Sequence, residues 1–408
     1  MGQRREGARV LIYSHDSFGL GHLRRCREIA HAFVERRPDV SVLILSGSPI
    51  IGSFDFRTRV DFVRIPGVIK LRNGQYQSLS PQIGIRDTLS TRAAIIRCTA
   101  ETFAPDLFIV DKEPLGLRGE VRDTLWQLKK RCVPLVLGLR DVLDEPAALA
   151  PEWARKRVVP ALDSLYDEIW VYGLPEICDP LAGIEVPASV RRKTIYTGYL
   201  ERTPPATVPE PDRPFILVTP GGGADGDLLV DWVLRAYESD ADLPLPAVVV
   251  LGPFMAQEHK AEFMRRAARL DRVEMITFDT HIERLMAQAS GIVAMGGYNT
   301  FCEILSFDKP AVIVPRTVPR REQWIRADRA ARTGLMRMLE DDGRRDASTM
   351  AEALRRLPGQ ARPSSAGVAG LLGGLDTVHA RSLRYLPPPA GAPAGTGAFD
   401  MAASSYGR

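Results

Sequence analysis

Short apolar runs alternate with amphipathic segments along the first half of the chain. The first run, residues 10–13 (VLIY), precedes a segment in which Leu23, Cys26, Ile29 or Ala30, and Phe33 recur at helical spacing. Further apolar runs, each predicting a strand, lie at residues 40–45, 60–65, 106–111, 134–141 and 168–173. Strands that alternate with helices predict βαβ units and a mainly parallel sheet. The polar stretch 70–86 has little periodicity and is predicted to be a long surface loop.

A second alternating series begins after a proline-rich stretch (ERTPPATVPEPDRP) without apolar periodicity, which is typical of a linker. Its apolar runs lie at 215–220, 246–253, 273–278, 291–297 and 310–316. The sequence therefore predicts an α/β protein with two Rossmann-like, doubly wound domains that face a central cleft. The expected parts are an N-terminal domain, a linker, a C-terminal domain and a disordered Pro/Gly/Ala-rich tail, at residues 1–200, 201–213, 214–385 and 386–408.

Composition and charge narrow the function classes. Lys and Arg total 54 against 50 Asp and Glu in 408 residues, a net charge of +4 that is too small to indicate nucleic-acid binding. Five widely spaced cysteines without a C-x-x-C pair argue against a disulfide scaffold or a zinc site and fit a reducing, cytoplasmic compartment. No apolar run approaches the roughly 20 residues of a membrane helix, so we expect at most peripheral membrane contact.

The turn after the first predicted strand, HDSFGLGH (residues 15–22), can be compared with the glycine fingerprint of a dinucleotide-binding site. Gly19 and Gly21 supply two glycines of the fingerprint, but Arg24 occupies the third position. The second strand ends in ILSGSP without an acidic residue for a ribose, and no P-loop motif occurs, so a nicotinamide, flavin or P-loop site is disfavoured. The turn still allows close backbone approach at a helix N-terminus. There His22 either faces the cleft or is a cap or surface residue.

The sequence GGYNTFCE in the second half has a similar arrangement. A strand ends at Gly296 and Gly297, a helix opens near Asn299 and Thr300, and Glu303 lies one turn later. A helix N-terminus of this kind can face a diphosphate, and the carboxylate can accept hydrogen bonds from a ribose. Alternatively, Glu303 complements the helix dipole or forms a capping box with Thr300. After the next strand come Arg316, Arg320 and Arg321, which either neutralise phosphates or form a solvated loop.

With GLGH, GGYNTFCE and KPAVIVPR followed by EQ, the chain resembles the GT-B nucleotide-sugar glycosyltransferases over residues 8 to 340. It is most similar to those related to the N-acetylglucosaminyl transferase of the lipid-linked peptidoglycan precursor, with the family 28 C-terminal domain. The resemblance implies that the C-terminal domain binds the donor, with Glu303 on the ribose, Gln323 on the sugar and Phe278 at the base. It also puts His22 on the acceptor side. The resemblance also puts the turn of Gly221, Gly222 and Gly223 near the diphosphate. From the residues themselves, Gly296, Gly297, Asn299, Thr300 and Arg320 are further predicted donor-side residues.

The implied reaction moves a sugar from a nucleotide-diphosphate donor, with UDP favoured, to a small-molecule, glycan or lipid-linked acceptor. Because the free pKa of histidine lies near neutrality, His22 is the first candidate for general base. Asp111, Glu113 and Asp141, at the ends of predicted strands, are competitors, although each could instead be a helix cap or a salt-bridge partner.

No D-x-D motif occurs where it could bind a nucleotide-linked cation; the DAD at 240–242 lies in a polar stretch. We therefore expect catalysis without a metal or a cofactor. The N-terminal turn is poorer in glycine and threonine than that of the peptidoglycan enzyme, so its acceptor is not carried over. Two other functions stay open: a nucleotide-sugar 2-epimerase or hydrolase on the same fold, and a non-catalytic sugar-nucleotide-binding protein.

Overall fold

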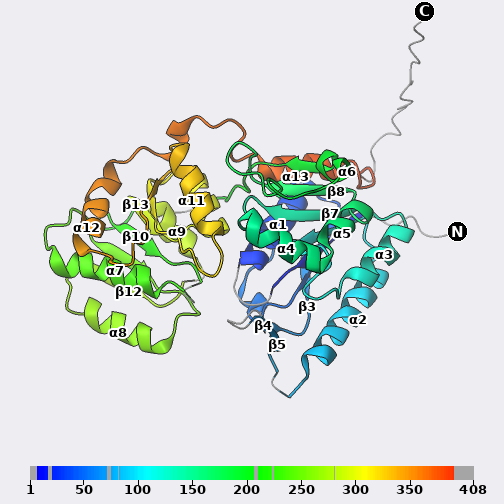
Figure 1. Ribbon diagram of the computed structural model, residues 1–408, viewed down its shortest axis with the longest axis horizontal. Helices are drawn as coiled ribbons and strands as arrows, with labels where there is room; N and C mark the ends of the chain where they lie inside the picture. The colour runs from blue at the N-terminus through cyan, green and yellow to red at the C-terminus, as the bar shows by residue number, and fades with distance from the viewer. Residues whose placement is uncertain are drawn as a thin grey trace, which may run out of the picture.

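The computed structural model describes residues 7–16, 21–70, 75–80, 82–205, 210–222, 225–279 and 281–389. Two α/β domains, each with its own parallel sheet, lie side by side (Figure 1). The predicted fold class, two Rossmann-like doubly wound domains, is confirmed. Gly19, Gly223 and residues 390–408 of the predicted tail lie outside the described residues.

Within the described residues, the N-terminal sheet has seven parallel strands in the order β3-β2-β1-β6-β7-β8-β9. Their bounds are β1 (Ala8–Ser14), β2 (Val40–Ser46), β3 (Val60–Arg64), β6 (Leu107–Asp111), β7 (Leu135–Arg140), β8 (Glu168–Tyr172) and β9 (Thr194–Tyr196). Strands β6 and β8 are buried at every residue, because helices cover both faces of a parallel sheet. These helices are α1 (Gly21–Arg36), α2 (Ile85–Phe103), α3 (Arg122–Lys130), α4 (Pro146–Lys156), α5 (Val158–Ser164) and α6 (Ala188–Arg192), with a 3-10 turn η1 (Ile51–Ser53).

The stretch 70–86, predicted to be one long loop, differs from that expectation. Strand β5 (Tyr76–Ser78) pairs antiparallel with β4 (Val68–Lys70), and α2 begins at Ile85. Three-residue strands carry too few positions for an alternating apolar pattern, so only the pairing between them identifies this hairpin.

In the described part of the C-terminal domain, the sheet has six parallel strands in the order β12-β11-β10-β13-β14-β15. Their bounds are β10 (Ile216–Thr219), β11 (Ala247–Val250), β12 (Val273–Ile276), β13 (Gly291–Ala294), β14 (Ala311–Ile313) and β15 (Arg337–Met338). The helices are α7 (Asp227–Ser239), α8 (Gln257–Ala267), α9 (Ile282–Gln288), α10 (Tyr298–Ser306), α11 (Glu322–Arg332) and α12 (Ala347–Arg356), with 3-10 turns η2 (Leu357–Gly359) and η3 (Pro363–Ala366). Valines and isoleucines fill the central strands, which are buried throughout.

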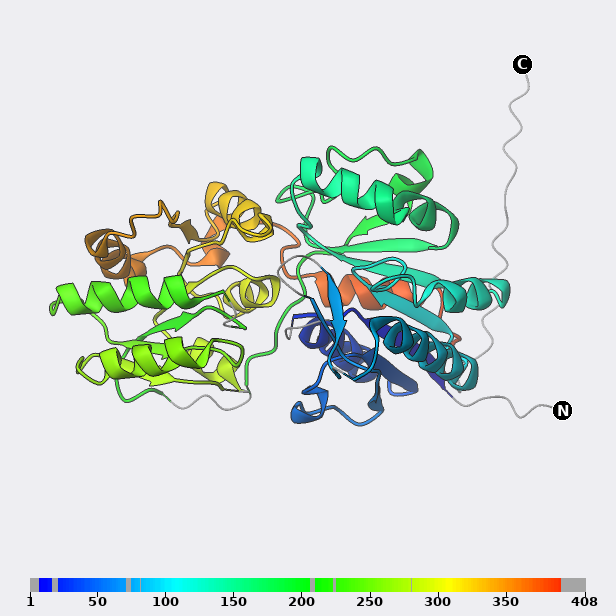
Figure 2. The same cartoon turned by 60° about the horizontal axis from the view of Figure 1, so that its bottom comes forward.

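The last helix, α13 (Gly374–Ser382), packs on the N-terminal domain, although the sequence puts it in the C-terminal one. It lies beside that domain's sheet in both views (Figures 1 and 2). Arg36 of α1 donates to Asp376 at 2.6 Å, Arg381 donates to Glu168 of β8, and Leu200 forms a β-bridge with Gly373. The polypeptide thus crosses between the domains twice. A short amphipathic helix carries no sequence signal for which domain it covers.

In each sheet the strand order reverses at one point, which separates β1 from β6 in the first and β10 from β13 in the second. Neighbouring connections leave such a switch point in opposite directions, so a crevice opens beyond the carboxyl ends of the two strands. Ligand sites of open α/β sheets lie there. The described strands form two such points, one in each domain.

Candidate functional site

Both switch points line one cavity of about 330 Å³ between the domains. The start of α1 forms its N-terminal wall, and the loops after β10, β12, β13 and β14 form the opposite wall. Most of the residues proposed from sequence are in its wall: Gly21, His22, Gly221, Gly222, Phe278, Gly296, Gly297, Asn299, Thr300, Glu303 and Gln323.

On the N-terminal wall, His22 is paired with Asp111 at the end of β6. Its Nδ1 lies 2.5 Å from Oδ2 of Asp111, and Arg25 donates to Oδ1 of the same carboxylate at 2.6 and 2.8 Å. Burial would raise the pKa of Asp111, but the charges of Arg25 and His22 lower it well below its ordinary value. The Arg25 guanidinium also lies 2.9 Å from Nδ1 of His22. An ionised Asp111 can accept a proton from Nδ1, and in that tautomer Nε2 of the neutral imidazole is unprotonated.

The pKa of His22 itself favours the neutral ring. Burial lowers it to about 4, despite the opposing charge of Asp111. The side chain keeps 20% of its exposure and lines the cavity. A neutral, oriented imidazole at a cavity wall can accept a proton from a bound hydroxyl. Asp111, one of the competing candidate bases, is 2% exposed and holds His22 in place.

Asp16 supports the same turn from behind. One carboxylate oxygen accepts from the backbone N–H of Leu23 at 3.1 Å, and the other accepts from the hydroxyl of Ser46 at 2.5 Å. Burial raises the pKa of Asp16 to about 6. This side chain satisfies an N–H group of the first turn of α1 and thereby fixes the start of the helix that carries His22.

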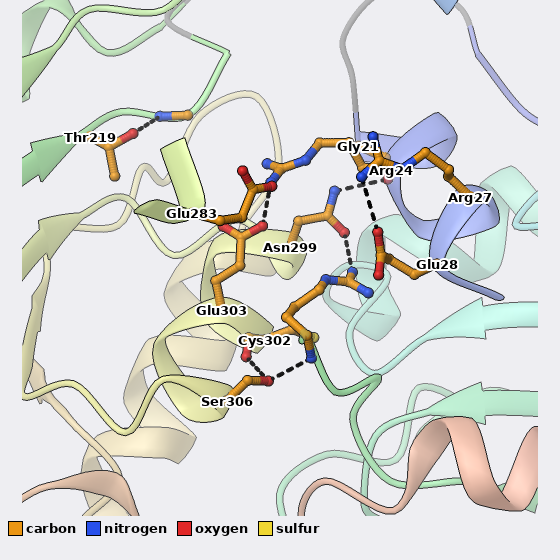
Figure 3. A network of polar contacts seen from close by, with 12 residues as sticks. Gly21, Arg24, Arg27, Glu28, Thr219, Glu283, Asn299, Cys302, Glu303 and Ser306 are labelled. Atoms are coloured by element: carbon orange, nitrogen blue, oxygen red, sulfur yellow. Dashed lines mark hydrogen bonds and ion pairs between the residues drawn. The ribbon is translucent and has the colours of Figure 1, made fainter. Parts of the chain in front are cut away.

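On the C-terminal wall, Glu303 of α10 is 1% exposed and in contact with the other domain (Figure 3). Arg24 of α1 reaches across the cleft and donates to Glu303 at 2.5 Å and to Glu283 of α9 at 2.6 Å. Burial raises the pKa of Glu303 to about 7, against the lowering effect of Arg24. In this ligand-free structure the carboxylate implied to hold a ribose is therefore occupied by an arginine.

Asn299, at the start of α10, makes a second bridge between the domains. Its Nδ2 donates to the carbonyl of Gly21 at 3.0 Å, and its Oδ1 accepts from Arg202 at 3.0 Å (Figure 3). The helix that carries Glu303 is thus tied to the first residue of α1. A ligand that enters here meets both domains at once.

Glycines let the backbone approach the cavity at the ends of two C-terminal strands, β10 and β13. Gly221 after β10 has φ +77° and Gly296 after β13 has φ +78°, the left-handed region that favours glycine. Gly297 caps α10, and a side chain there would meet nothing within 4 Å, so the space in front of this helix N-terminus is open. An open helix N-terminus with free N–H groups suits an anion.

The remaining C-terminal wall residues lie around these turns. Phe278, after β12, is 40% exposed. Gln323 is buried, and its side-chain oxygen accepts from the backbone N–H of Arg316 at 3.2 Å. Arg316 forms ion pairs with Asp225 at 2.9 Å and Glu322 at 2.7 Å. The loop after β14 therefore presents a cation to the cavity.

Four cavity-lining residues keep buried polar atoms without a hydrogen-bond partner among the described residues. These atoms are Nε of Arg140, Nε of Arg316, Oε2 of Glu322 and the hydroxyl of Tyr298. Buried polar groups are almost always paired, so a cluster of unpaired ones at a cavity indicates polar groups of a ligand.

Three residues proposed from sequence lie away from this cavity. Asp141, 0% exposed, accepts from Arg326 at 2.6 and 2.8 Å and from the hydroxyl of Tyr199 at 3.0 Å. Glu113 pairs with Lys156 at 3.0 Å. Arg320 pairs with Glu152 of α4 at 2.9 Å, an ion pair between the domains. In this state all three side chains form structural ion pairs. For Asp141 and Glu113 this is the salt-bridge alternative that the sequence left open.

Sequence reasoning missed Arg24, Arg25 and Arg140 as wall residues. For Arg24 and Arg25, the sequence signal for a wall position is their place on the first turn of a helix that follows a glycine turn. In the sequence, Arg24 stands out only as the residue that breaks a glycine fingerprint. Its contact with Glu303 joins positions 279 residues apart, which no local pattern encodes.

Among the residues that the structure describes, no group of three or more His, Cys, Asp or Glu side chains is placed to hold a metal ion. No helix in the described part of the chain is long and apolar enough to cross a membrane. All five cysteines are free.

Comparison with known proteins agrees with this geometry. Residues 216–361 match the Glycosyltransferase family 28 C-terminal domain. The calicheamicin glycosyltransferase CalG4 superposes with a TM-score of 0.59 at 15% identity, over 94% of this chain and 98% of its own. A ugt transferase from Siraitia grosvenorii in complex with UDP gives 0.58 at 13%, over 92% and 99%. The chain has the GT-B fold.

One segment of this GT-B chain is also similar in sequence to a curated protein. The UDP-N-acetylglucosamine--N-acetylmuramyl-(pentapeptide) pyrophosphoryl-undecaprenol N-acetylglucosamine transferase of Opitutus terrae is 26% identical over 100 residues, 24% of this chain. The match spans about a quarter of that relative, 26% of its length. Together these findings support a divergent GT-B glycosyltransferase.

Proposed function

We propose that the protein transfers a sugar from a nucleotide-diphosphate donor, a UDP-sugar, to an acceptor hydroxyl without a metal. The observation that carries this proposal is the meeting of Glu303 and His22 on opposite walls of one cavity. A glycosyl transfer needs a donor site and a base that face each other, and each switch point supplies one of them.

The donor binds to the C-terminal wall. The carboxylate of Glu303 accepts hydrogen bonds from the ribose hydroxyls, and the backbone turns at Gly221 and Gly296 face the diphosphate. Phe278 contacts the base and Gln323 the donor sugar. The UDP in one structural neighbour and the UDP-sugar in the name of the curated relative support the choice of base.

The base is His22. Its Nε2 takes the proton of the acceptor hydroxyl as the acceptor oxygen bonds to the anomeric carbon and the bond to the diphosphate breaks. Asp111 keeps the imidazole in the required tautomer and stabilises the imidazolium that forms. The charge that develops on the leaving diphosphate meets Arg316 and the N-terminus of α10.

Donor binding requires Arg24 to leave Glu303. Arg24 has a second carboxylate partner in Glu283, so it can yield Glu303 to the ribose without becoming an unpaired buried charge. In this proposal the exchange couples occupation of the donor site to the contact between the domains. The acceptor is a small molecule, a glycan or a lipid-linked compound in the cytoplasm; nucleic acid is not a partner.

The test is a panel of UDP-, GDP- and dTDP-sugars, first as thermal shifts and then as incubations with and without acceptor mixtures. Transfer to an acceptor with release of UDP supports the proposal. Free monosaccharide without an acceptor indicates a hydrolase, and an isomerised donor indicates an epimerase. Binding of the donor without change fits either a transferase that lacks its acceptor or a non-catalytic protein. Hydrolysis or isomerisation without transfer refutes the proposal.

A further inference from the structure

A second cavity, of about 420 Å³, lies on the N-terminal domain. Its wall is formed by the loop from Glu113 to Arg122, by the junction between α4 and α5, and by Tyr76 of the β4–β5 hairpin. The floor contains Pro114, Leu115, Leu117 and Val158. We call this cavity the basic pocket.

Arginines dominate the polar wall of the basic pocket: Arg118, Arg122, Arg155 and Arg157. Within the described residues, none of these four side chains forms an ion pair or donates a hydrogen bond. Glu113 is the acidic residue of the wall, and Lys156 of the same wall neutralises it at 3.0 Å. The pocket therefore carries an uncompensated positive charge above an apolar floor, and guanidinium groups are the usual ligands of phosphate and carboxylate.

This pocket adjoins the catalytic pair through one short segment. Asp111, which holds His22, is followed by Lys112 and then by Glu113 of the pocket wall, a span of at most about 7 Å. The ammonium group of Lys112 also has no ion pair among the described residues. Burial and the nearby Arg140 lower its pKa to about 8, which a bound anion would reverse.

Two non-glycine residues here have left-handed backbones. Lys112 has φ +65°, and Arg157, between α4 and α5, has φ +53°. Such conformations cost on the order of 1–2 kcal/mol and concentrate at functional sites. Both of these residues carry a positive charge: Arg157 belongs to the wall of the basic pocket, and Lys112 precedes the wall residue Glu113 in the chain.

We propose that the basic pocket binds an anionic group of the acceptor, a phosphate ester or a carboxylate, while the acceptor hydroxyl lies at His22. This inference rests on the proposed function, because it assigns the acceptor to the N-terminal wall. Lys112 lies between the two positions and contacts the anion from the side of the catalytic pair. The acceptor is thus an anionic compound long enough to join the two cavities.

The first experiment measures the binding of inorganic pyrophosphate by calorimetry. Arg122→Ala/Arg155→Ala should weaken it about tenfold or more and flatten its salt dependence, because two phosphate contacts are lost. The matched control is Arg64→Ala/Arg97→Ala, which removes two exposed arginines elsewhere on the same domain. Arg316→Ala removes a cation of the donor cavity and separates binding there from binding in the basic pocket.

Pyrophosphate affinity that falls only in the Arg122/Arg155 variant supports the proposal. Affinity that falls equally in the control, or only with Arg316→Ala, overturns it. Thermal shifts with UDP are recorded on every variant. A normal UDP shift with no effect of Arg122→Ala/Arg155→Ala on pyrophosphate refutes the basic pocket alone, whereas absence of any nucleotide shift in the parent protein refutes the proposed donor site.

A vesicle assay distinguishes the two sources of such an anion. Phosphatidylcholine vesicles with and without phosphatidic acid are sedimented with the parent protein and the same variants. Binding that needs both phosphatidic acid and the intact arginines supports the pocket with a lipid phosphate as its ligand. Pocket-dependent pyrophosphate binding without vesicle binding supports it with a soluble anion.

Discussion

The sharpest test of the donor site compares two carboxylates that share one arginine. Glu303 and Glu283 both accept from Arg24, at 2.5 and 2.6 Å, but of the two Glu303 alone belongs to the cavity wall. If Glu303 accepts two ribose hydroxyls, Glu303→Ala removes two charge-assisted hydrogen bonds worth about 1.5–3 kcal/mol each. Release of Arg24 from Glu303 offsets part of this loss.

We therefore expect Glu303→Ala to weaken UDP binding by about 3 kcal/mol, on the order of 100-fold in Kd. Glu303→Gln keeps an acceptor oxygen but loses the charge, so a loss of roughly 5- to 30-fold is expected. Glu283→Gln is the control and should stay within about threefold. Isothermal titration with UDP measures all three, and urea unfolding checks that each variant folds.

The pH dependence of UDP affinity, measured by the same calorimetric titration, is a second test of the ribose assignment. The ionised carboxylate is the better acceptor, and the pKa of Glu303 is about 7 in the ligand-free protein. UDP affinity should therefore be fully present above pH 7 and fall as the pH drops below it. Glu303→Gln has no carboxylate to titrate at this position, so this loss of UDP affinity at low pH should be absent in that variant. Equal losses at Glu303 and Glu283, or an unchanged affinity in Glu303→Ala, would refute the ribose assignment.

The remaining predictions concern the base, an ion pair and a helix cap. His22→Gln should lower kcat by about 10²–10⁴-fold with little change in the urea midpoint; near-normal turnover would exclude His22 as base. Since the pKa of His22 is lowered to about 4, the acid limb of kcat, measured at saturating donor so that protonation of Glu303 in the free enzyme does not enter, should fall near pH 4, and a limb near 6.5 would contradict this. Asp141→Asn leaves the buried Arg326 without its counter-ion and should cost about 3–5 kcal/mol of unfolding free energy; under 1 kcal/mol would show that the pair is unimportant. Asp346 caps α12 by accepting from the N–H of Ser348 at 2.8 Å, so Asp346→Ala should cost about 1 kcal/mol by the same assay.

The sequence by itself determined the features that depend on neighbours along the chain. Apolar runs defined the central strands, and glycine turns before helix starts placed His22 and Glu303 on first or second helical turns. Backbone and side-chain preferences over a few residues suffice for this, because a strand, a turn and a helix are local structures. The two-domain α/β fold follows from their order.

Only the tertiary structure decided which side chains the acids at the strand ends contact. Asp111, Glu113 and Asp141 give the same signal in sequence, an acid after a buried strand, yet they bind His22, Lys156 and Arg326 respectively. Strand order separates Asp111 from Asp141, because β6 lies beside β1 at the switch point and β7 lies one strand further. Glu113 follows the same strand as Asp111 but lies two residues beyond its end, where it pairs with Lys156 of α4. Contacts between the domains are beyond any local pattern, since residues nearly 300 positions apart must be brought together by two separately folded sheets.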